Sequence, residues 1–202
     1  MQFLIGNKSI LAKLITTLTI LTWLTILVFA IWTSRGINTA FIYETGEISG
    51  QIAAALFCLS ILPGISRRLK FKAPMVTLLM IIRRQLGIAM FSVAFLHYSS
   101  IRLFPIIFAG VPMNLSPPVF EIFGVLTLFP LFFLFITSNN FAVKSLKSWW
   151  GRVHKIVYIS IWALFLHIAL QEFGIWTIVI GTFALMETLS LFYYYAQKST
   201  SS

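Results

Sequence analysis

The side chains of this sequence best suited to chemistry are its three histidines, His97, His154 and His167. Each lies in a mainly apolar stretch, and an ionisable group inside a membrane is costly and usually serves a function. His97 lies 14 residues after Arg83, and His167 lies 14 residues after Val153. If both stretches are helices that enter the membrane from the same side, the two imidazoles lie at equal depth. That arrangement suits one metal ion held between them.

Two imidazoles at equal depth fit the axial ligands of a heme iron, which are neutral nitrogens presented by two rigid elements. Zinc prefers four ligands in a tetrahedron, and no cysteine or carboxylate cluster lies near His97 in the sequence. His154 lies about 20 Å below His167 on an ideal helix and about 140° around its axis, an offset that a distorted helix start would absorb. The alternative for each histidine is a hydrogen bond to a neighbouring helix without any cofactor.

The composition is that of an integral membrane protein. Of the 202 residues, 59% are hydrophobic and 10% are charged, whereas soluble domains average about 45–50% apolar and about 25% charged residues. The chain is therefore expected to be an all-α membrane protein of one domain, residues 1–202, with the lipid bilayer as its solvent. No GxGxxG or GxxxxGK[ST] run indicates a nucleotide-binding module.

Six apolar stretches predict a bundle of six transmembrane helices. They are Ile10–Trp32, Ile48–Ile65, Gln85–Phe108, Val119–Ile136, Val153–Leu170 and Ile175–Tyr195. Pro63-Gly64 is expected to end the second helix, and residues 196–202 are expected to form a polar tail. Met75–Ile82 is too short to span and is expected to lie along the cytoplasmic interface. Glu187 is expected either to pair with a buried donor or to lie near the inner interface.

The basic residues predict the orientation of these helices. Thirteen of the 15 Lys and Arg lie on one side, before the first helix, between helices two and three, between four and five, and after six. Arg35 and Arg102 lie on the other side, together with four of the five glutamates. The positive-inside rule then predicts that both termini are cytoplasmic. This clustering of the basic residues between apolar runs also argues against nucleic acid as a partner, despite a net charge of +10.

Several segments resemble the ferric reductase-like transmembrane domains. They are Arg83-Arg84-Gln85-Leu86-Gly87-Ile88 continuing to Leu96-His97, then Phe135-Ile136-Thr137-Ser138, Trp150, Val153-His154 and His167. The resemblance covers about residues 45–170. Within the family, it is greatest to the heme-binding membrane subunits of bacterial periplasmic methionine-sulfoxide reductase systems. It implies a b-type heme held by His97 and His167 toward the outer face.

The resemblance also implies a second redox site near His154, toward the cytoplasm. Larger relatives carry a histidine where this chain has Arg83, so the inner site has His154 as its one imidazole, with Arg83 opposite. It could hold a second, five-coordinate heme, FMN or a quinone. Arg83 could pair with a heme propionate or a flavin phosphate.

The function implied is that of a heme b electron-transfer subunit in the bacterial inner (plasma) membrane, an oxidoreductase component without a substrate site of its own. Its donor would be a cytoplasmic flavin reductase or the quinol pool. Its acceptor would be a periplasmic reductase subunit, with a molybdenum-containing methionine-sulfoxide reductase as the first candidate. Two alternatives are a stand-alone ferric or cupric metalloreductase and, from another class, a small transporter whose histidines relay protons.

Overall fold

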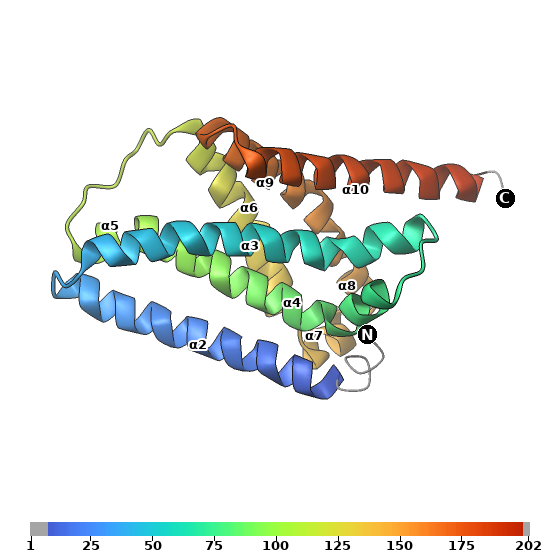
Figure 1. Cartoon of the computed structure of the whole chain (residues 1–202), viewed down its shortest axis with the longest axis horizontal. Coiled ribbons are helices and arrows are strands. Elements are labelled where there is room, and N and C mark those ends of the chain that lie inside the picture. Colours follow the sequence, from blue (N-terminus) through green and yellow to red (C-terminus); the bar gives the residue numbers. More distant parts are fainter. Residues whose placement is uncertain (1–7, 200–202) are drawn as a thin grey trace.

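A computed structural model describes residues 8–199, and every regular element in this range is a helix (Figure 1). Six stretches are long and apolar enough to cross a membrane: Lys8–Ser34, Thr39–Arg68, Pro74–Phe108, Val119–Ile136, Ser148–Gln171 and Ile175–Ser199. Long helices satisfy their own backbone hydrogen bonds, which a lipid environment demands. The prediction of an all-α protein with six membrane-spanning helices is confirmed, and the cytoplasmic position of the termini stays a prediction.

The helices follow one another with short connections. In chain order they are α2 (Lys8–Ser34), α3 (Thr39–Arg68), α4 (Pro74–Tyr98), the π-helical turn η1 (Ser99–Leu103), α5 (Phe104–Phe108), α6 (Val119–Ile136), α7 (Asn140–Leu146), α8 (Ser148–Val153), the 3₁₀ turn η2 (His154–Ile156), α9 (Val157–Gln171) and α10 (Ile175–Ser199). The interruption at η2 is a distorted helix start at His154.

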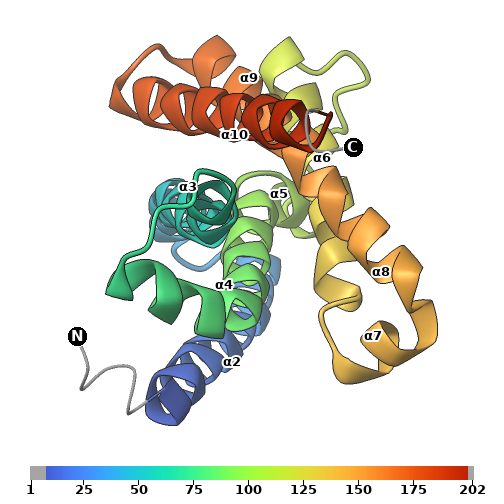
Figure 2. The same cartoon turned by 90° about the vertical axis from the view of Figure 1, so that its right-hand side faces the viewer.

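Two helix pairs form the centre of the bundle, α3 with α4 and α6 with α9. Helix α2 packs on α4, and α10 packs on both α9 and α3, so that α10 joins the two pairs. In Figure 2, α4 faces α6 across the middle of the molecule. One apolar core cluster joins α4 and α6 to α3, α9 and α10, and its members Phe57, Ile161 and Ile180 are at most 1% exposed.

Helix α3 does not end at Pro63-Gly64 as the sequence suggested, but continues to Arg68. A proline inside a helix removes one backbone hydrogen bond and costs about 3 kcal/mol. Tertiary packing offsets this cost here, because Ile61 and Ile65 are both buried in the core on either side of the proline. The prediction failed because it considered only local propensity.

The stretch Met75–Ile82 forms the first turns of α4, in one helix with the span that follows. In Figure 2 these turns lie across the direction of the rest of α4. Leu79 and Ile82 pack against residues of α2 and α3, so the segment is part of the bundle. At the other end of the chain, α10 extends to Ser199, so most of the expected polar tail is helical, and residues 200–202 lie outside the described range.

Candidate metal centre

The structure brings His97 and His167 together. His97 lies in the last turn of α4 and His167 in the second half of α9, and both side chains are half-buried. The centroids of the two imidazole rings are 6.4 Å apart, with an angle of 70° between the ring planes. The two rings therefore lie side by side, and their role as ligands of one metal stays a prediction.

Both histidines are fixed by the same kind of hydrogen bond. The Nδ1 atom of His97 lies 2.8 Å from the carbonyl oxygen of Gly46 in α3, and Nδ1 of His167 lies 2.7 Å from the carbonyl oxygen of Phe120 in α6. A carbonyl oxygen can only accept, so Nδ1 must carry the hydrogen in each ring. Each neutral imidazole then keeps a lone pair on Nε2, which is the form that binds a metal.

The separation of the rings fits one metal ion between them. Two imidazoles on opposite sides of one metal have centroids about 6.3 Å apart, for a metal–nitrogen bond of about 2.0 Å and a ring radius of roughly 1.1–1.2 Å. The observed 6.4 Å is close to that value. Within residues 8–199 no group of three or more His, Cys, Asp or Glu side chains could complete a tetrahedral site. The donor set therefore suits a two-imidazole axial site, as in a heme protein.

The segment that carries His97 is held to α6, the helix that packs on the helix of His167. The π-helical turn η1 directly follows the helix of His97, and such turns are frequent at functional sites. Arg102 in this turn forms an ion pair with Glu121 in the first turn of α6. Near the middle of α4, Arg84 donates hydrogen bonds to the Ser138 carbonyl oxygen and to Asn140 Oδ1, each at 2.7 Å. Arginines at two levels of the α4 segment thus hold it to α6 and the turn after α6.

The third histidine, His154, has a different environment. Its ring stacks on Trp150, with centroids 4.0 Å apart, and its Nε2 lies 3.2 Å from Thr137 Oγ1. Thr137 donates its own hydroxyl hydrogen to the Phe133 carbonyl oxygen at 2.6 Å, so His154 Nε2–H is the donor in the contact with Thr137. The free lone pair of His154 is therefore on Nδ1, whereas those of His97 and His167 are on Nε2.

The end of the bundle that carries His154 also holds a buried charge network, of which the sequence analysis named one member, Glu187. Arg68 forms an ion pair with Glu187 and donates hydrogen bonds to Ser190 Oγ at 2.9 Å and to the Tyr158 hydroxyl at 3.3 Å. Arg68 is 8% exposed and Glu187 is 2% exposed. The sequence had placed Arg68 among the loop charges. The one available signal was Glu187, a carboxylate within an apolar helix, which does pair with a buried donor.

Arg83 lies on the same side of the bundle as this network. Its charge interacts electrostatically with His154, Tyr158 and Arg68. The side chain is exposed, in contrast to that of Arg68. The charge of Arg83 therefore acts on His154, at the end of the bundle where the sequence analysis expected a second site.

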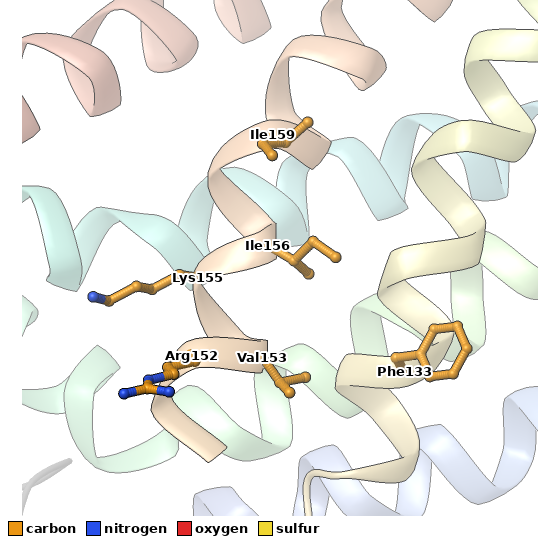
Figure 3. A pocket seen from close by; sticks show the side chains of 6 residues that line it. All are labelled: Phe133, Arg152, Val153, Lys155, Ile156 and Ile159. Carbon is orange, nitrogen blue, oxygen red and sulfur yellow. The ribbon is translucent and has the colours of Figure 1, made fainter. Parts of the chain in front are cut away.

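A groove of about 470 Å³ lies between Phe133 of α6 and the segment 152–159, and His154 is not among its lining residues. Figure 3 shows Val153 and Ile156 turned toward Phe133, with Arg152 and Lys155 extending on the other side of the helix. The wall is mostly apolar, and Arg152 lies over the ring of Trp149 at 4.6 Å. The groove therefore offers an apolar surface with the cationic side chains of Arg152 and Lys155 beside it, and no reactive group among the residues that line it.

A comparison with known protein families matches the chain to one family model. Residues 49–166, more than half of the chain, match the ferric reductase like transmembrane component family. The matched range contains His97 and His154 and ends one residue before His167. No solved structure matches the chain. The match and the six spans make this a multi-pass membrane protein whose family suggests electron transfer across the membrane. The chain belongs to the ferric reductase-like transmembrane family.

Proposed function

We propose that this protein is a heme-binding membrane subunit that transfers electrons from the cytoplasmic side to an acceptor outside. The observation that carries the proposal is the His97–His167 pair, with its 6.4 Å centroid separation and both Nδ1 atoms committed to backbone carbonyls. Members of the ferric reductase-like family bind heme, and this pair has the donor type and spacing that axial ligation of a heme iron requires.

The residues have distinct roles in this proposal. His97 and His167 hold the iron through Nε2, while the Gly46 and Phe120 carbonyl oxygens fix the tautomer and orientation of the two rings. A bound heme b supplies a one-electron redox centre within the membrane. The Arg102–Glu121 pair holds the ends of the two histidine-bearing halves in register. These residues bind and orient, and no substrate chemistry is assigned to them.

The inner end is proposed as the place where electrons enter. The charge of Arg83 acts on His154, which supports a shared site, and Arg83 could neutralise a heme propionate or the phosphate of FMN. The groove lined by Val153, Ile156 and Phe133 has mostly apolar walls, which suits a lipid-soluble quinol as donor. A second heme, FMN and a quinone all remain candidates for the inner site, and a cytoplasmic flavin reductase is the alternative donor.

The proposed partner outside is a periplasmic reductase subunit, with a methionine-sulfoxide reductase as first candidate and the bacterial inner membrane as location. This part rests on the resemblance of the segments from Arg83 to His97 and from Trp150 to His167. The alternative of a stand-alone metalloreductase draws on outer carboxylates to bind the metal substrate. Glu121 is already paired with Arg102, which leaves that alternative less support.

Visible spectroscopy of the purified protein, expressed with ample heme, tests the proposal. We expect a low-spin b-type spectrum, a pyridine hemochrome of heme b, and reduction by a donor added on the cytoplasmic side of proteoliposomes. A matched preparation of His97→Ala with His167→Ala controls for heme bound adventitiously. A colourless wild-type protein, or one whose heme content equals that of the double variant, would contradict the proposal and favour the proton-relay transporter.

A further inference from the structure

Two glycines lie directly against the paired histidines. A Cβ atom on Gly50 would lie 2.8 Å from Nδ1 and 3.0 Å from Cε1 of His97. A Cβ atom on Gly124 would lie 3.0 Å from both Cε1 and Nδ1 of His167. Real Cβ atoms rarely or never approach another heavy atom this closely. Each imidazole therefore occupies space that any other residue type would fill.

Helix geometry explains why these two positions must be small. Gly50 lies four residues after Gly46, and Gly124 lies four residues after Phe120, which are the residues whose carbonyls accept from the histidines. In a helix, the carbonyl of residue i points toward residue i+4, whose N–H it accepts. An imidazole that donates to the same carbonyl from a neighbouring helix must pass beside residue i+4. Only a residue without a side chain leaves that path open.

The same short sequence occurs at both places. Residues 46–50 read Gly-Glu-Ile-Ser-Gly and residues 120–124 read Phe-Glu-Ile-Phe-Gly, so both contain Glu-Ile-x-Gly. The first lies early in α3, which packs on the helix of His97, and the second lies early in α6, which packs on the helix of His167. The two halves of the site are thus built alike, with one carbonyl and one glycine for each histidine.

We infer that Gly50 and Gly124 are positioning residues, each of which seats one imidazole so that its Nδ1–H meets the carbonyl one turn earlier and its Nε2 points at the shared ligand. The inference rests on the proposed heme at this pair. A methyl group at either position displaces the ring, breaks the Nδ1 hydrogen bond and withdraws Nε2. Loss of such a supporting contact typically weakens metal binding by about 10–100-fold.

The test compares Gly50→Ala and Gly124→Ala with Gly181→Ala. A Cβ atom on Gly181 would lie 2.9 Å from the Phe165 ring, so this control is equally crowded but touches no histidine. We expect each of the first two variants to lose the low-spin spectrum or to bind heme about 10–100-fold more weakly. Gly181→Ala should keep the wild-type spectrum even if its unfolding temperature falls. Low-spin heme bound within twofold of wild-type affinity in Gly50→Ala and Gly124→Ala would overturn the inference.

A second pair of variants separates seating from general damage to the fold. In His97→Gly, added imidazole can bind the iron without a tether to α4 and can shift away from a methyl group at position 50. There, Gly50→Ala should cause no further loss of the imidazole-restored low-spin spectrum. A further loss of tenfold or more would mean that Gly50 acts on the fold rather than on His97, and would overturn the inference.

The inference can fail separately from the proposed function. In the heme-free protein labelled with ¹⁵N at histidine, nuclear magnetic resonance reports which ring nitrogen carries the hydrogen. Wild type and Gly181→Ala should show His97 protonated on Nδ1, and Gly50→Ala should lose this preference. An unchanged His97 signal in Gly50→Ala would refute the inference that Gly50 positions the His97 imidazole, whether or not heme binds. A wild-type protein that shows this preference but takes up no low-spin heme would contradict only the proposed function.

Discussion

Replacing Glu187 by alanine should destabilise the bundle more than any replacement of an exposed charge. The change leaves the Arg68 guanidinium buried without its counter-charge, with Ser190 and Tyr158 as its remaining partners. Removal of one partner from a buried ion pair costs about 3–5 kcal/mol, because the other charge stays desolvated. At roughly 2–4 °C per kcal/mol for a chain of this size, the unfolding temperature should fall by about 6–20 °C.

Thermal unfolding in detergent micelles, followed by the fluorescence of the six tryptophans, measures this effect. Glu172→Ala is the matched control, since Glu172 is an exposed glutamate after α9 and should change the unfolding temperature by about 2 °C at most. Arg68→Met combined with Glu187→Leu should recover most of the loss, because a buried ion pair can be replaced by apolar packing at little cost. An unfolding temperature of Glu187→Ala within 2 °C of wild type would contradict the burial of the Arg68–Glu187 ion pair between α3 and α10.

The remaining predictions concern the orientation, the outer ion pair and the inner site. Reporter fusions after Lys147 should be cytoplasmic and fusions after Met113 exterior, by the positive-inside rule; the reverse result would invert the proposed direction of transfer. Arg102→Ala and Glu121→Ala should each lower the free energy of unfolding by only about 0.2–1 kcal/mol, since these side chains are 37% and 19% exposed. The unfolding temperature of each variant measures this loss. His154→Ala should slow reduction by a cytoplasmic donor, while dithionite still reduces the heme at His97 and His167. Donor-driven reduction at the wild-type rate would contradict a redox site at His154.

The sequence predicted those helices best whose ends are marked by local chemistry. Helix α6 begins after Pro117-Pro118 and ends before Thr137, as expected, because the prolines and the polar turn act without help from tertiary structure. The end of α3 was misjudged because burial of Ile61 and Ile65 outweighs the effect of Pro63. Helix propensity is a local property and does not include the energy of burying these two side chains in the core.

The candidate site was predictable in its side chains but not in its backbone partners. Counting residues along two helices expected to enter the membrane from the same side placed His97 and His167 at one depth, and the structure has their ring centroids 6.4 Å apart. The Gly46 and Phe120 carbonyls that fix their tautomers have no signature in side-chain identity. Arg68 was assigned to a loop because charge counting treats a buried arginine and a loop arginine alike.

The most direct test of the central claim is the spin state of the heme iron in single histidine variants. A heme iron held by two opposite imidazoles loses its low-spin state when either one is removed. Electron paramagnetic resonance of the purified oxidised protein should therefore show the wild-type low-spin signal in His154→Ala, whereas His97→Ala and His167→Ala should each lack it. A low-spin signal of wild-type position and amplitude in either His97→Ala or His167→Ala would contradict the account.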